Sequence, residues 1–119
     1  MMKGTLVERI RNQADIFVIA GPCSAESHAQ VSSITTNIVA TNKVNMLRAG
    51  IWKPRTHPNS FEGLGLKALP WLVEAGRLLE VPTCTEVANK THVEAALKAG
   101  VDALWIGAVS YTHLTLPTT

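Results

Sequence analysis

Short apolar runs alternate along the chain with segments in which apolar residues recur every three or four positions. The apolar runs end at turn residues, which predicts buried strands at 16–20, 45–48, 82–86 and 103–106. The segments between them predict amphipathic helices at about 26–41, 66–79 and 91–100. Strands that alternate with helices in this way indicate an α/β fold with a parallel sheet and right-handed crossovers.

Three local signals predict where helices begin. Thr5-Leu6-Val7-Glu8 and Thr91-His92-Val93-Glu94 fit the capping box, in which a threonine and a glutamate three residues later cap a helix start. The first of these predicts a short helix ahead of the first strand. Pro70 interrupts the second long helix, which either begins near Leu69 with Pro70 in its first turn or bends at Pro70.

The same order of strands and helices fits two arrangements of the sheet. One is an open, doubly wound sheet and the other is a (β/α)₈ barrel, and periodicity does not separate them. The first strand is followed by Gly21-Pro22-Cys23-Ser24 and not by the G-x-G-x-x-G pattern of dinucleotide-binding sheets. This difference counts against a dinucleotide-binding fold.

Composition narrows the class of protein without adding a function. The chain has 119 residues, of which 46% are hydrophobic and 17% charged, so it predicts one globular domain and not a disordered segment. A net charge of +2 predicts no nucleic-acid partner. The apolar runs fall short of the roughly 18–20 residues of a membrane span, and the two cysteines make no disulfide framework. We therefore expect a cytoplasmic protein that binds no membrane.

A basic cluster follows the second predicted strand. Arg48, Lys53 and Arg55 lie within eight residues, and the stretch from Ser27 to Phe61 contains no aspartate or glutamate. The carboxyl ends of parallel strands gather functional groups, and cations that converge there favour an anionic small molecule. Phosphate and carboxylate groups would neutralise them. A solvated basic loop without a ligand is the alternative that the residue types leave open.

Two further candidates end neighbouring strands. Cys23 follows the first strand where a helix begins, a position that favours the thiolate and therefore a nucleophile or a soft metal ligand. A small packed thiol is the alternative for Cys23 and the expectation for Cys84. Glu86 ends the third strand, where its carboxylate could orient a cation or a water, or pair with Lys90.

The histidines and tryptophans carry weaker signals. The four histidines lack metal-binding spacing, and we expect His28 and His92 on exposed helix turns. Packing is the simplest role for Trp52, Trp71 and Trp105.

Six motifs in order resemble the 3-deoxy-7-phosphoheptulonate (DAHP) synthases of type Iβ. The resemblance covers about residues 4–108. The motifs are Gly21-Pro22-Cys23-Ser24, Leu47-Arg48-Ala49-Gly50, Lys53-Pro54-Arg55-Thr56, Ser60-Phe61-Glu62-Gly63-Leu64-Gly65, Thr85-Glu86-Val87 and Trp105-Ile106-Gly107-Ala108. The N-terminus looks most like the bifunctional enzymes that also carry a chorismate mutase domain. The resemblance implies the N-terminal half of a (β/α)₈ TIM barrel that ends after the fourth strand. It also implies an oligomeric parent enzyme.

The resemblance implies a transferase that condenses phosphoenolpyruvate with erythrose 4-phosphate, the first step of the shikimate pathway to chorismate and the aromatic amino acids. It makes Lys53 and Glu86 catalytic residues and assigns phosphoenolpyruvate to Arg48 and Lys53. The loop that cradles erythrose 4-phosphate would be Lys53, Pro54, Arg55 and Thr56. Cys23 would be a ligand of a divalent metal such as Mn²⁺.

The chain departs from the family pattern in two ways, one beyond its fourth strand and one directly after it. The family's remaining metal ligands are a histidine, a glutamate and an aspartate from later strands, and Val109 stands where the family has a phosphate-binding arginine. We expect residues 1–108 to be a partial barrel, residues 109–119 to be a non-native tail, and the chain alone to be inactive. The alternatives are a non-catalytic phosphate-binding half-barrel and a 3-deoxy-octulosonate 8-phosphate synthase, which the Lys-Pro-Arg-Thr sequence disfavours.

Overall fold

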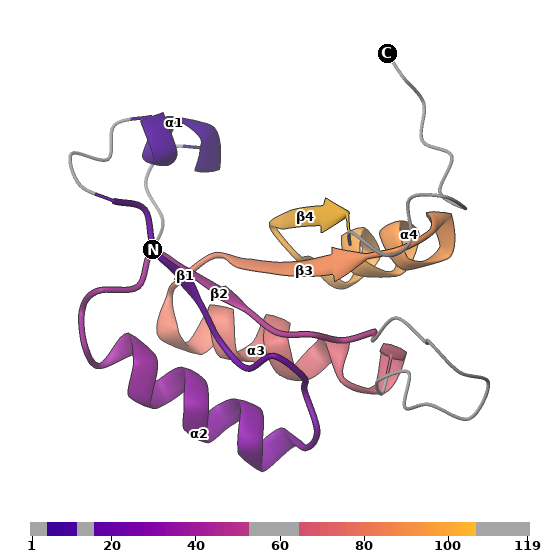
Figure 1. Ribbon diagram of the computed structural model, residues 1–119, viewed down its shortest axis with the longest axis horizontal. Helices are drawn as coiled ribbons and strands as arrows, with labels where there is room; N and C mark the ends of the chain where they lie inside the picture. Colours follow the sequence, from indigo (N-terminus) through magenta and orange to yellow (C-terminus); the bar gives the residue numbers. More distant parts are fainter. Residues whose placement is uncertain (1–4, 12–15, 53–64, 107–119) are drawn as a thin grey trace.

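A parallel four-stranded sheet forms the centre of the fold. The computed structural model describes residues 5–11, 16–52 and 65–106 (Figure 1). The strands lie in sequence order and pair in parallel, and they are β1 (Ile19–Ala20), β2 (Met46–Arg48), β3 (Thr83–Val87) and β4 (Ala103–Ile106). Neighbouring strands in sequence order are what a (β/α)₈ barrel requires, so the predicted α/β fold and half-barrel topology are confirmed.

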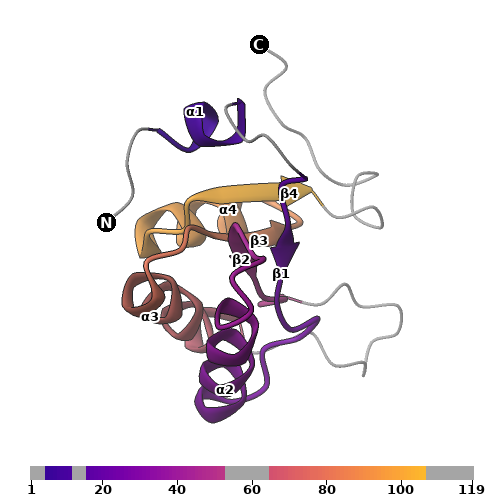
Figure 2. The ribbon, with the colours of Figure 1, turned by 90° about the vertical axis from the view of Figure 1, so that its left-hand side faces the viewer.

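The helices form a layer on one face of this sheet. Helices α2 (His28–Val39), α3 (Leu69–Leu79) and α4 (Lys90–Ala99) lie side by side, and α1 (Leu6–Arg11) lies apart from them (Figures 1 and 2). A short 3₁₀ helix, η1 (Gly65–Lys67), precedes α3. The core between helices and sheet is made by side chains that are fully buried or nearly so: Val31, Leu47, Ala49, Ile51, Leu69, Leu72 and Ala96.

The other face of the sheet carries different chemistry. Successive side chains of a strand point to opposite faces, and Leu47 belongs to the core on the helix side. Arg48 is therefore on the opposite face, which we call the inner face. The register pairs Arg48 with Cys84 and Glu86 with Trp105, so these residues share that face.

Strand β1 is shorter than the predicted run of 16–20. The ladder includes only Ile19 and Ala20, because the Val18 amide donates a hydrogen bond of 2.8 Å to the Asn45 side chain instead. Ile16 is 82% exposed, so the start of the run lies outside the core. The apolar pattern located the strand but could not show this competing side-chain acceptor.

Helix starts follow three capping patterns, of which the sequence predicted one. The Thr5 hydroxyl accepts a hydrogen bond of 3.1 Å from the Glu8 amide at the start of α1, as expected. Helix α2 begins with a capping box formed by Ser27 and Gln30. For α4 the predicted box at Thr91 is wrong, because Asn89 is the N-cap residue and its side chain accepts 2.9 Å from the His92 amide.

The position of Pro70 decides between the two predictions for α3. This helix begins at Leu69, with the proline in its first turn. Proline is tolerated there because the amide that it lacks would have no partner within the helix. The helix is therefore not bent at Pro70.

None of the helices in the described ranges is long and apolar enough to cross a membrane.

We predict that Ser27→Ala loosens the start of α2 by about 1 kcal/mol, because the substitution removes the side-chain acceptor of the Gln30 amide. Hydrogen exchange of the first-turn amides measures the change, with Ser33→Ala on the exposed surface of α2 as the matched control. Unchanged protection in Ser27→Ala would contradict the capping role.

Candidate active site at the strand ends

The segments that follow β1 and β2 meet at two glycines. A Cβ atom on Gly21 would collide with the carbonyl of Arg48, and one on Gly50 would collide with the carbonyl of Cys23. The Gly50 amide donates to the Pro22 carbonyl over 3.3 Å, and the Gly50 carbonyl accepts from the Ala25 amide over 2.8 Å. These backbone contacts bring Cys23 and Arg48 to the same end of the sheet, as the positions of the predicted strand ends implied.

The loop that carries Cys23 is also tied to helix α2. The Gln30 side chain donates a hydrogen bond of 2.9 Å to the Ser24 carbonyl and accepts one of 2.7 Å from the Glu26 amide. Both polar groups of the Gln30 side chain, in the first turn of α2, are therefore bonded to the loop backbone. The Cys23 side chain is exposed in this loop.

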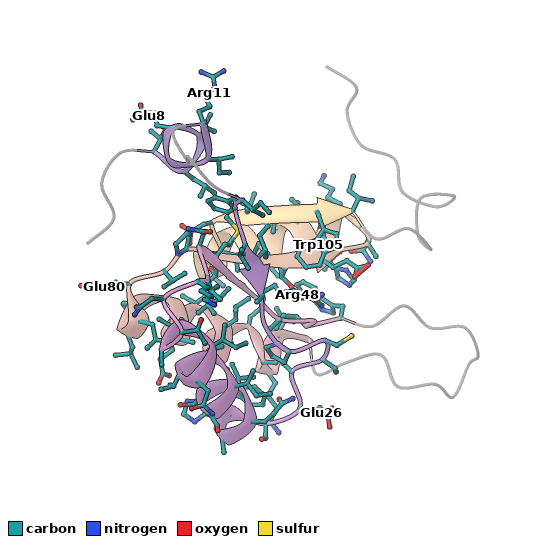
Figure 3. All side chains as sticks on the ribbon, turned by 60° about the vertical axis from the view of Figure 1, so that its left-hand side comes forward. Glu8, Arg11, Glu26, Arg48, Glu80 and Trp105 are labelled. Carbon is teal, nitrogen blue, oxygen red and sulfur yellow. The ribbon has the colours of Figure 1, made fainter. Side chains whose placement is uncertain are left out.

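Arg48 is the central side chain of the inner face. Its Nη2 atom lies 3.5 Å from the Cys23 carbonyl oxygen, and its guanidinium carbon lies 5.3 Å from the centre of the Trp105 ring. Figure 3 shows Arg48 and Trp105 near one another at the strand ends. An indole face attracts a cation but leaves its N–H groups available for other acceptors.

The Arg48 Nε atom is buried and has no hydrogen-bond partner in the part of the chain that the structure describes. A buried N–H without an acceptor is costly, more so in a charged group. An anion with oxygen acceptors would satisfy it. Arg48 therefore has the charge and the unused donor of an anion site.

Cys84 lies next to Arg48 in the sheet register. Burial raises the pKa of the Cys84 thiol to about 11, although the positive charge of Arg48 acts in the opposite direction. Burial therefore favours the neutral thiol at neutral pH, which agrees with a packing role. The predicted packing role of Cys84 is confirmed by its 2% exposure.

Glu86 is half-buried on the inner face, two residues beyond Cys84 along β3. Lys90, which was its predicted alternative partner, lies 3.9 Å from Glu94. Within the described ranges no ion pair joins Glu86 to Lys90. Because Glu86 is two residues after Cys84, which pairs with Arg48, its carboxylate faces the same side of the sheet as Arg48.

The described residues supply only part of the metal site that the sequence led us to expect. Cys23 could supply one thiolate, but the described ranges hold no group of three histidine, cysteine, aspartate or glutamate side chains that could bind an ion. These residues do not form a metal site by themselves.

The basic loop falls outside the described residues. Lys53, Pro54, Arg55 and Thr56 all belong to the segment 53–64, which begins directly after Trp52. Their proposed roles stay predictions.

Two aromatic contacts were not predicted from the sequence. Trp105 contacts Arg48, and His92 is half-buried and stacks on Trp52, so the expectation of an exposed His92 is wrong. His28 is exposed as expected, and Trp52 and Trp71 pack against the core. The signal for Trp105 was its place at a strand end, but its contact with Arg48 depends on the register of three strands.

Comparison with known proteins identifies the family. The pattern of the DAHP synthetase I family matches residues 7–116. The phospho-2-dehydro-3-deoxyheptonate aldolase of Thermotoga maritima is 36% identical over 91 residues, which are 76% of this chain and 26% of that protein.

A solved structure agrees in fold as well as in sequence. The crystal structure of phospho-2-dehydro-3-deoxyheptonate aldolase (DAHP synthase) from Thermotoga maritima superposes with a TM-score of 0.68 at 33% identity. The match covers 82% of this chain and 30% of that one, so the chain spans between a quarter and a third of these relatives. On the extent of the family match and the shared arrangement of the sheet, the chain belongs to the DAHP synthetase I family.

Proposed function

We propose that this chain is the N-terminal part of an enzyme that condenses phosphoenolpyruvate with erythrose 4-phosphate to give DAHP. In this reaction C3 of phosphoenolpyruvate attacks the aldehyde carbon, whose oxygen takes up a proton. Water adds at C2, and the bond between C2 and the phosphate oxygen breaks, which releases inorganic phosphate. The proposal is supported by membership of the family and by the activity for which the Thermotoga maritima relatives are named. The type Iβ assignment, a following mutase domain and a cytoplasmic, oligomeric parent are parts of the same proposal.

The structural observation that carries the proposal is the buried Nε atom of Arg48, which has no hydrogen-bond partner among the described residues. In the proposed complex Arg48 donates to the carboxylate or phosphate oxygens of phosphoenolpyruvate. Trp105 holds the guanidinium from one side, and the Cys23 carbonyl lies 3.5 Å from its Nη2 atom. A guanidinium that is already held in place loses little conformational freedom when the substrate binds. The entropy cost of binding is therefore smaller and the affinity higher.

The other site residues complete this proposal. Glu86 shares the inner face with Arg48, where its carboxylate can orient a water or a proton donor near the enol carbon. Lys53, Pro54, Arg55 and Thr56 are proposed to hold the phosphate of erythrose 4-phosphate, and Lys53 also to bind phosphoenolpyruvate. Cys23 would contribute one ligand to a divalent metal, which would polarise the aldehyde when bound.

A non-catalytic phosphate-binding half-barrel remains the alternative function. It would use the same Arg48 donor but would need neither Glu86 nor a metal. Turnover by the longer enzyme separates the two functions, because a binding module would retain phosphoenolpyruvate without consuming it.

We predict that Arg48→Ala in the longer enzyme lowers kcat/KM by at least about tenfold, because it removes charge-assisted hydrogen bonds worth about 1.5–3 kcal/mol. Lys53→Ala should have a comparable effect. The assay follows phosphoenolpyruvate consumption. Arg77→Ala is the matched control, because Arg77 is an exposed arginine near the end of α3. Near-normal kcat/KM in Arg48→Ala would contradict the proposed site.

We also predict that the 119-residue chain alone does not turn over. Its described part holds no group of three metal donors, and the family's other ligands are expected from later strands. The purified chain should therefore leave phosphoenolpyruvate unconsumed in the presence of erythrose 4-phosphate and Mn²⁺. Consumption above the protein-free background would show that this part suffices for catalysis.

A further inference from the structure

A serine hydroxyl beside the candidate site is buried without a hydrogen-bond partner. Among the described residues, the buried side-chain polar atoms that lack a partner are Oγ of Ser24 and Nε of Arg48. Ser24 follows β1 and Arg48 ends β2, so both atoms belong to the two backbone segments that approach each other at Gly21 and Gly50. The anion proposed for Arg48 accounts for only one of these two atoms.

The backbone of Ser24 lies close to the Arg48 guanidinium. The carbonyl of Cys23, which is bonded to the Ser24 amide nitrogen, lies 3.5 Å from Nη2 of Arg48. On its other side, the Cα atom of Ser24 would lie 3.4 Å from a Cβ atom placed on Gly50, two residues after Arg48. The Ser24 side chain therefore begins one peptide unit away from a group that the guanidinium contacts.

The backbone groups nearest to this hydroxyl already have other partners. A serine hydroxyl commonly binds the amide two residues further on, but the Glu26 amide donates to the Gln30 side chain over 2.7 Å. The Ser24 carbonyl accepts from the same Gln30 side chain over 2.9 Å. The Ala25 amide donates to the Gly50 carbonyl over 2.8 Å. The loop backbone is therefore satisfied by Gln30 and Gly50, and the hydroxyl is left without a local partner.

A hydroxyl that is buried without a hydrogen bond lowers the stability of the folded protein. Alanine at the same position would avoid this cost. A hydroxyl can donate one hydrogen bond, and a guanidinium can only donate. A ligand that satisfies both Ser24 and Arg48 must therefore offer acceptors, which is what the oxygens of an anion provide.

We propose that Ser24 is a further binding residue of the anion site, where its hydroxyl donates to a carboxylate or phosphate oxygen of the anion that Arg48 binds. This inference rests on the proposed function, in which that anion is phosphoenolpyruvate. The surrounding atoms cover the hydroxyl, so it reaches the anion by rotation about the Cα–Cβ bond from one staggered rotamer to another. The backbone held by Gln30 and Gly50 need not move, and the anion site then spans the ends of β1 and β2.

A hydroxyl kept for a ligand affects stability and binding in opposite ways. Ser24→Ala removes a buried polar atom that has no partner among the described residues, so the folded protein should be at least as stable as the wild type. The same substitution removes a hydrogen bond to a charged ligand, so the anion should bind more weakly. A hydroxyl with a structural role would instead lower the stability when it is removed.

The test uses the longer enzyme without erythrose 4-phosphate, so that no turnover occurs. Calorimetry measures the affinities for phosphoenolpyruvate and for inorganic phosphate, and a thermal melt without either ligand measures stability. The matched control is Ser33→Ala, because Ser33 is an exposed serine of α2. In Ser24→Ala the affinity for phosphoenolpyruvate should fall about tenfold and the melting temperature should not fall, whereas the control should match the wild type in both.

The two ligands show which group of the substrate the hydroxyl binds. Weaker binding of both ligands would assign it to the phosphate, and weaker binding of phosphoenolpyruvate alone would assign it to the carboxylate, and either result supports the inference. Wild-type affinities in Ser24→Ala would overturn it. A lower melting temperature or a failure to fold would also overturn it, because the hydroxyl would then have a structural role.

The same variant separates this inference from the proposed function. Phosphoenolpyruvate binding that depends on Ser24, in an enzyme that forms no DAHP, would support the binding role and contradict the proposed function. Formation of DAHP by the wild type, together with wild-type affinity in Ser24→Ala, would support the function and overturn the role of Ser24.

Discussion

The close approach of the backbone segments after β1 and β2 is the constraint on which the candidate site depends. Gly21 and Gly50 each lie against a carbonyl of the other segment, where a side chain would collide. This approach places the Cys23 carbonyl near the Arg48 guanidinium. Parallel pairing in register then brings Cys84, Glu86 and Trp105 to the same face. A side chain at Gly21 or Gly50 would push the two segments apart, and Cys23 and Arg48 would lose their contact.

Among the residues that the structure describes, no carboxylate forms an ion pair with Arg48. Its described neighbours are an indole face, a carbonyl and a buried neutral thiol. A carboxylate in direct contact would neutralise the guanidinium and compete with an anionic ligand, whereas cation–π attraction leaves the N–H groups available. The buried Nε atom that lacks an acceptor among the described residues is consistent with a donor kept for a ligand.

Sequence patterns predicted the features that depend on local burial and on single residues. The four strands, the helix between each pair and the start of α3 near Pro70 follow from apolar spacing and from the missing proline amide. The approach of Cys23 and Arg48 could be predicted as well, because the ends of neighbouring parallel strands meet at one edge of the sheet.

Features that depend on competition between side chains, or on register, could not be predicted. The Asn45 side chain takes the Val18 amide and shortens β1, and Asn89 caps α4 ahead of the expected threonine. The contact between Arg48 and Trp105 and the stack of Trp52 on His92 join residues far apart in the sequence. Their geometry is set by how β2, β3 and α4 pack, which periodicity does not encode.

A double-mutant cycle on Arg48 and Trp105 in the longer enzyme tests the central claim most directly. Calorimetry would measure the affinity for phosphoenolpyruvate in wild type, Arg48→Ala, Trp105→Leu and the double variant. If Trp105 holds Arg48 for the anion, both single variants weaken binding and the pair is coupled by about 1 kcal/mol, because Trp105→Leu has little left to disturb once Arg48 is absent. Strictly additive losses, or wild-type affinity in Arg48→Ala, would contradict the account.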